Sequence, residues 1–114
     1  MTQSHFDVTV HNELGATVVS LTGELDIAAA PTLEERLELI FAEGTPQLVV
    51  DLRSLEFIDS TGLSVLVKAN QRAEETGLRF GLAGGGTQVR RLLSLTGIAD
   101  RLTVAEEPAE LLGS

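Results

Sequence analysis

Two hydroxyl residues stand between a carboxylate and a glycine in the middle of the chain, in the segment Asp59-Ser60-Thr61-Gly62. An apolar run precedes this segment and a stretch with helical apolar spacing follows it, so the hydroxyls lie where a helix is expected to begin. Free backbone N–H groups at a helix start can hold a phosphate group. Ser60 is therefore the residue at which we expect a regulatory switch.

The same segment also fits a plain helix N-terminus, because Asp and Ser are favoured caps that contribute about 1 kcal/mol. Two features favour a further role. Three residues that can cap stand in a row where one would be enough, and Gly62 lies in the first helical turn, where Gly costs about 1 kcal/mol relative to Ala. A glycine at that place lets another backbone or molecule approach closely. Local chemistry leaves both interpretations open.

The chain offers few other residues that could serve in catalysis or in metal binding. The chain contains no Cys, which excludes disulfides, thiolate metal sites and Cys nucleophiles. Its two histidines, His5 and His11, lie in the first strand region without a carboxylate cluster at metal-ligand spacing. Ser60 lacks the Gly-x-Ser-x-Gly context of a hydrolase, and the glycines at 84–86 lack the Lys of a phosphate-binding loop. We expect no catalytic residue, no metal and no cofactor.

The composition is typical of one small acidic domain, which we expect to span residues 1–114. The formal net charge of −9 argues against binding to nucleic acid or to an anionic membrane, because either would need a basic patch. No apolar run approaches the roughly 20 residues that span a bilayer, and residues 1–5 do not read as a signal peptide. We expect a cytoplasmic monomer that suits a partner with a basic face.

Hydrophobic periodicity predicts the elements that position Ser60. The expected strands cover 6–10, 16–22, 47–52, 78–83 and 102–104. Four helices are expected: one that starts at Pro31, one that starts after Ser60, and two that cover 87–96 and 108–112. The three main helices each stop before a glycine, at Gly44, Gly77 and Gly97, where a left-handed residue is favoured. The order β-β-α-β-α-β-α-β-α predicts an α/β fold with a mixed four- to five-stranded sheet and about four helices.

Three parts of the chain follow the pattern of a known family. They are Gly23-Glu24-Leu25-Asp26 after the second expected strand, residues 48–52 with 57–63, and residues 89–98. These segments resemble the G-x-L-D motif, the central signature and the third-helix segment of STAS domain proteins, specifically the bacterial anti-sigma factor antagonists. The resemblance covers nearly the whole chain, with no departure at the signature positions.

The resemblance implies partner switching. In such antagonists the Ser after the signature Asp is phosphorylated by an anti-sigma factor with a GHKL-type serine kinase fold. The unphosphorylated antagonist binds that kinase, which then releases its sigma factor, and a serine phosphatase restores the antagonist. Carried onto this chain, Ser60 is the phosphoacceptor and Thr61 a weaker second acceptor. The implied partner-binding residues are Glu24, Asp26, Asp59, Thr61 and Gly62.

Two other functions remain to be distinguished. A non-switching STAS subunit, such as an accessory component of a membrane transporter or lipid-transport complex, would use the same fold and keep Ser60 as a mere cap. A small hydrolase or nucleotide-binding enzyme is the third class. A phosphate on Ser60, co-purification with a transporter, or turnover of an ester or nucleotide would separate the three.

Overall fold

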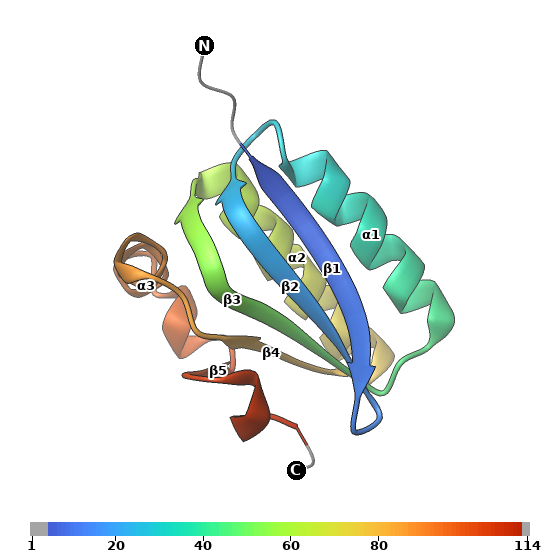
Figure 1. Cartoon of the computed structure of the whole chain (residues 1–114). Helices are drawn as coiled ribbons and strands as arrows, with labels where there is room; N and C mark the ends of the chain where they lie inside the picture. Colours follow the sequence, from blue (N-terminus) through green and yellow to red (C-terminus); the bar gives the residue numbers. More distant parts are fainter. Residues whose placement is uncertain (1–4, 113–114) are drawn as a thin grey trace.

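The computed structural model describes residues 5–112 as a five-stranded sheet with three α-helices (Figure 1). Residues 1–4, from which we predict no signal peptide, and residues 113–114 lie outside that range. In chain order the elements are β1 (Phe6–Glu13), β2 (Ala16–Leu25), α1 (Ala30–Glu43), β3 (Gln47–Ile58), α2 (Ser60–Thr76), β4 (Arg79–Ala83), α3 (Thr87–Leu95), the 3-10 helix η1 (Ile98–Asp100), β5 (Val104–Ala105) and the 3-10 helix η2 (Pro108–Glu110).

The strands lie side by side in the order in which they occur along the chain. β1 and β2 form the expected antiparallel hairpin, whereas each later strand runs parallel to its neighbour. The predicted α/β fold with a mixed sheet is therefore confirmed. Within residues 5–112, no helix has the length and apolar character needed to cross a membrane.

Two predicted elements differ from those observed in type or by more than three residues in length, while the other boundaries differ by three residues or fewer. The helix expected at 108–112 is only the 3-10 turn Pro108–Glu110, so three α-helices are present rather than about four. The segment is too short for a stable α-helix and uses the tighter turn that short pieces adopt. The strand expected at 47–52 continues to Ile58, because β2 stays paired with it across two register shifts. The shorter prediction rested on the apolar run that ends at Leu52, and the polar residues Arg53 and Ser54 that follow it gave no sign of the continued pairing.

The main core lies between α1, α2 and the sheet face that they cover (Figure 1). Its fully buried members are aliphatic and come mostly from β2, β3 and the two helices; they include Val19, Leu21, Leu25, Leu33, Leu52, Ile58 and Leu66. Burying such a side chain contributes about 1.5–3 kcal/mol. The core therefore fixes the ends of β2 and β3, and with them the positions of the residues that follow these strands.

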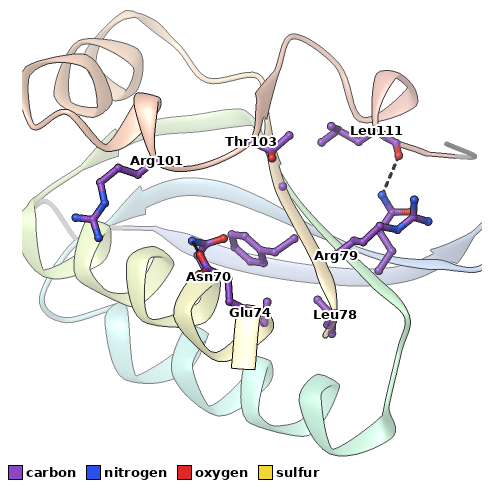
Figure 2. A pocket seen from close by; sticks show the side chains of 11 residues that line it. Asn70, Glu74, Leu78, Arg79, Arg101, Thr103 and Leu111 are labelled. Atoms are coloured by element: carbon purple, nitrogen blue, oxygen red, sulfur yellow. Dashed lines mark hydrogen bonds between the residues drawn. The ribbon is translucent and has the colours of Figure 1, made fainter. Parts of the chain in front are cut away.

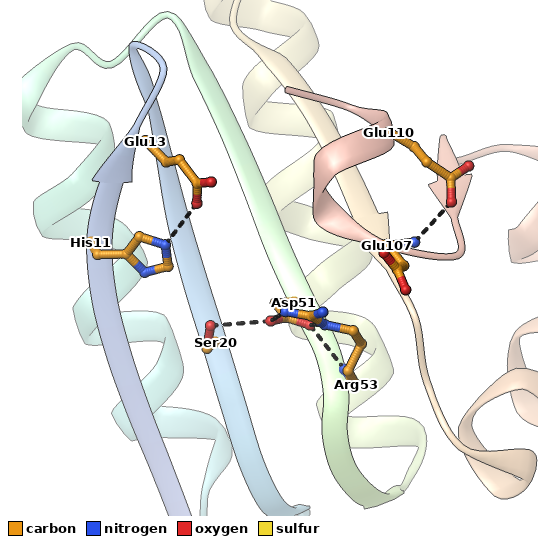
Figure 3. A network of polar contacts seen from close by, with 7 residues as sticks. All are labelled: His11, Glu13, Ser20, Asp51, Arg53, Glu107 and Glu110. Carbon is orange, nitrogen blue, oxygen red and sulfur yellow. Dashed lines mark hydrogen bonds and ion pairs between the residues drawn. The ribbon is translucent and has the colours of Figure 1, made fainter. Parts of the chain in front are cut away.

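The opposite face of the sheet carries a polar network (Figure 3). Arg53 donates from Nε to Asp51 Oδ1 at 3.0 Å, and Ser20 donates from Oγ to Asp51 Oδ2 at 3.3 Å. Burial raises the pKa of the Asp51 carboxyl, but the hydrogen bonds from Arg53 outweigh it and hold that pKa below its usual value. Asp51 is thus a charged structural residue whose counter-ion is Arg53.

Candidate functional site

Ser60 is the first residue of α2, and α2 follows the carboxyl end of β3 (Figure 1). β2 and β3 run parallel and end side by side, with Leu25 paired to Ile58, so Asp26 and Asp59 follow neighbouring strand ends. The side chain of Ser60 is exposed. Its hydroxyl has no hydrogen-bond partner among residues 5–112. The fold thus presents an uncommitted hydroxyl at the rim of the sheet.

Asp59, and not Ser60, caps α2. Asp59 Oδ1 accepts a hydrogen bond from the backbone N–H of Gly62 at 2.9 Å. The other oxygen, Oδ2, accepts from the backbone N–H of Ile27 at 3.1 Å, which ties the β2–α1 loop to the start of α2. Because the Asp59 carboxylate makes both of these hydrogen bonds, the Ser60 hydroxyl is not needed for capping α2.

Asp26 organises the turn that leads into α1. Its Oδ1 accepts from the N–H groups of Ala28 at 3.1 Å and Ala29 at 3.0 Å, and its carbonyl accepts from Ala30 N at 2.9 Å. In the described part of the chain, no hydrogen bond joins either Asp26 or Asp59 to the Ser60 hydroxyl. Both carboxylates therefore shape the loops around Ser60, rather than orienting its hydroxyl directly.

The remaining predicted site residues surround this loop with different exposure. Glu24 and Thr61 are half-buried, while Gly62 is buried. A Cβ added to Gly62 would lie 2.5 Å from the carbonyl oxygen of Leu25 and 2.6 Å from Leu25 Cγ. The close approach expected at this glycine is therefore made by the end of β2, so Gly62 seats α2 against the sheet instead of offering a surface to a partner.

Gln88 supports the site and was not found from the sequence. Its Oε1 accepts from Ile58 N at 2.9 Å, and its Nε2 donates to Ile58 O at 2.8 Å. β4 pairs with β3 only as far as Asp51, so the later part of β3 has no strand on that side. Gln88 satisfies both backbone groups of the residue just before Asp59. No local pattern marks this role, since the two partners are 30 residues apart.

We expect Gln88→Leu to loosen the strand end that precedes Ser60. Each lost hydrogen bond is worth about 0.5–1.5 kcal/mol, so losing two should raise amide exchange at Ile58 and Asp59 by tenfold or more. Residue-resolved hydrogen exchange measures this effect. Gln71→Leu, at an exposed position of α2, is the control and should leave both amides unchanged. If amide exchange at Ile58 and Asp59 is unaltered in Gln88→Leu, then Gln88 does not hold the end of β3 in position.

A hollow of about 370 Å³ lies elsewhere, beside α2 and the edge of β4 (Figure 2). Its lining includes Asn70, Arg79, Phe80, Arg101 and Thr103, and no residue of the segments 24–26 or 59–62. Among residues 5–112 there is no group of three or more His, Asp or Glu side chains that could hold a metal ion. His11 contacts Glu13 near the β1–β2 turn (Figure 3), whereas Ser60 lies beyond the other end of β2.

The sheet, the helix order and the exposed serine at the start of α2 define a small α/β domain. Residues 5–111 match the STAS domain family. This chain belongs to that family.

Two named relatives and one solved structure that match this chain are anti-sigma factor antagonists. Over 91 residues, which are 80% of this chain and 74% of the relative, the sequence is 34% identical to the anti-sigma-F factor antagonist RsfB of Mycobacterium tuberculosis. Over 88 residues, 77% of this chain and 82% of the relative, it is 32% identical to the anti-sigma-B factor antagonist of Staphylococcus aureus. The crystal structure of an anti-sigma factor antagonist from Mycobacterium paratuberculosis matches with a TM-score of 0.86 at 32% identity, covering 93% of this chain and 90% of the other. The predicted resemblance is confirmed.

Proposed function

We propose that this protein is a single-domain anti-sigma factor antagonist that works by partner switching. With Ser60 unphosphorylated it binds an anti-sigma factor with a GHKL-type serine kinase fold, which frees a sigma factor. Phosphorylation of Ser60 ends that binding, and a serine phosphatase reverses the modification. The observation that carries the proposal is the exposed Ser60 hydroxyl, which does not cap α2 because Asp59 does so.

The named relatives support this function over that of an accessory subunit of a transporter or lipid-transport complex. In that second role Ser60 would be a mere cap, whereas the cap of α2 is Asp59. The protein acts as a monomeric cytoplasmic binding module without catalytic activity of its own. It needs no cofactor, and neither nucleic acid nor a membrane is its partner. Thr61 is half-buried, in keeping with a weaker second acceptor.

Electrostatics explains how one phosphate can end the interaction. A phosphoserine brings a charge of about −1.5 to −2 and three acceptor oxygens. Two unit charges 4 Å apart interact by about 4 kcal/mol at an effective surface dielectric. The segments 24–35 and 54–67 contain no Lys or Arg that could neutralise the added charge locally. The N-terminus of α2 stabilises the added negative charge by only about 0.3–2 kcal/mol. This stabilisation is the same in the free protein and in the complex, so it does not offset the repulsion. Repulsion at the interface therefore dominates.

Incubation of the protein with a candidate anti-sigma kinase and Mg-ATP, followed by intact mass and peptide mapping, tests the proposal. We expect one added phosphate located on Ser60. Ser60→Ala should remove most of the modification, whereas Thr61→Ala should leave most of it. A protein that binds the kinase and acquires no phosphate on Ser60 would contradict the switch. Co-purification with a transporter, again without phosphate, would favour the accessory-subunit role instead.

A further inference from the structure

Two large apolar side chains are exposed at the end of the sheet where Ser60 lies. Ile27, in the β2–α1 loop, is 72% exposed, and Phe57, one residue before the end of β3, is 39% exposed. The backbone N–H of Ile27 donates to Asp59 Oδ2 at 3.1 Å, so Ile27 is held against the cap of α2. Phe57 is three residues before Ser60 in the chain. Both side chains therefore border the proposed switch.

The backbone positions of Phe57 and Ile27 are both fixed by the fold. Phe57 pairs with Glu24 across β2 and β3, and its neighbour Ile58 points into the core. Because successive strand residues alternate between faces, Phe57 lies with Glu24 on the face away from α1 and α2. Ile27 is fixed through its own backbone and through the turn made by Asp26. Anchors held in this way lose little conformational freedom when a partner covers them.

Folding gives no reason for an isoleucine at position 27. The turn uses the Asp26 carboxylate and backbone N–H groups, while most of the Ile27 side chain remains in water. A single exposed aliphatic residue is ordinary on a protein surface. Two exposed large apolar residues, one bonded through its backbone to Asp59 and one three residues before Ser60, indicate a surface that a partner covers.

The charges around this pair define the partner's chemistry. Two of the segments at this end, 24–35 and 54–67, hold no Lys or Arg, and their acidic residues are Glu24, Asp26, Glu34, Glu35, Glu56 and Asp59. In the third, α3, Arg90 is already paired with Glu106. Well-packed apolar anchors inside a charged rim are the usual arrangement of a specific interface. A complementary partner offers apolar pockets that are bordered by Lys and Arg.

We propose that Ile27 and Phe57 are the apolar anchors that hold the anti-sigma factor, an inference that rests on the proposed function. Affinity and switching are then carried by different residues. The anchors fill apolar pockets of the partner, the carboxylates meet its cations, and Ser60 lies between them, where a phosphate breaks the fit. Removing an anchor weakens the complex but leaves the Ser60 hydroxyl available for phosphorylation.

The test measures the affinity of the unphosphorylated protein for the anti-sigma factor by titration calorimetry. We expect Ile27→Ser to weaken binding by tenfold or more, and Phe57→Ser to do the same. Leu39→Ser is the matched control, because Leu39 is 61% exposed on α1 and lies about 14 Å along the helix from Ala30; it should change affinity by less than twofold. At saturating kinase, Ile27→Ser should still acquire its phosphate on Ser60.

Each outcome decides a different point. Wild-type affinity in Ile27→Ser, together with phosphorylation of Ser60, overturns the anchor proposal and leaves the switch intact. No binding and no phosphorylation of the wild-type protein would overturn both. If Phe57→Ser fails to fold in a thermal scan, Ile27→Ser still decides, because its side chain is mostly in solvent. Self-association of the free protein that disappears in Ile27→Ser would assign the surface to a second copy and also overturn the proposal.

Discussion

Ser60→Asp is expected to bind the anti-sigma factor at least about a hundredfold more weakly than Ser60→Ala does. A few kcal/mol of repulsion between like charges at a surface corresponds to that ratio. The alanine variant keeps the surface neutral at this position and cannot be phosphorylated there, so most of it should stay bound in the presence of ATP. Because aspartate carries one charge and phosphoserine nearly two, the measured ratio is a lower bound for the natural switch.

Titration calorimetry with both variants and the wild-type protein measures this ratio. Ser94→Asp is the control for net charge, because it adds the same charge at an exposed position of α3. It should bind as the wild type does. Both Ser60 variants should unfold at the wild-type urea concentration, since the Ser60 side chain is exposed and without a partner among residues 5–112. Equal affinities of Ser60→Ala and Ser60→Asp would count against a charge-operated switch.

Gly62→Ala should destabilise the fold by about 1–3 kcal/mol, the range found for overpacked positions. The new methyl group would lie 2.5 Å from Leu25 O and 2.6 Å from Leu25 Cγ. The first of these atoms belongs to the backbone of β2 and cannot rotate away, so α2 has to move outward. Ala is intrinsically the better helix former by about 1 kcal/mol, and the steric overlap has to exceed that gain.

Urea unfolding measures the loss, and Ser64→Ala is the matched control. Ser64 is exposed on the same helix, where a small substitution should stay within about 0.5 kcal/mol. We expect Gly62→Ala also to weaken anti-sigma factor binding, because displacing α2 moves Ser60 and breaks the alignment of Asp59 with Ile27. A Gly62→Ala protein as stable as the wild type would mean that α2 does not lie against Leu25.

Much of the architecture could be predicted because its signals are local. Phe6, Val8 and Val10 alternate with polar residues, and the core-facing stripe of α1 repeats at helical spacing, so their neighbours in sequence already reveal strand and helix. Gly44 and Gly77 end α1 and α2 in the left-handed conformation, as predicted. The errors occur where the outcome depends on distant pairing, as in the extension of β3 along β2, or on chain length, as in η2.

At the site, the sequence alone determined that Ser60 begins a helix after a strand, because Asp, Ser and Gly signals act within one turn. It also determined the acidic character of the surrounding segments. Only the tertiary structure decided that Asp59 also binds the backbone of Ile27, that Gly62 faces β2 and that Gln88 holds Ile58. These contacts join residues about 30 or more positions apart, as Asp59 with Ile27 and Gln88 with Ile58. They exist only once β2, β3 and α3 have packed, and no neighbouring residue encodes them.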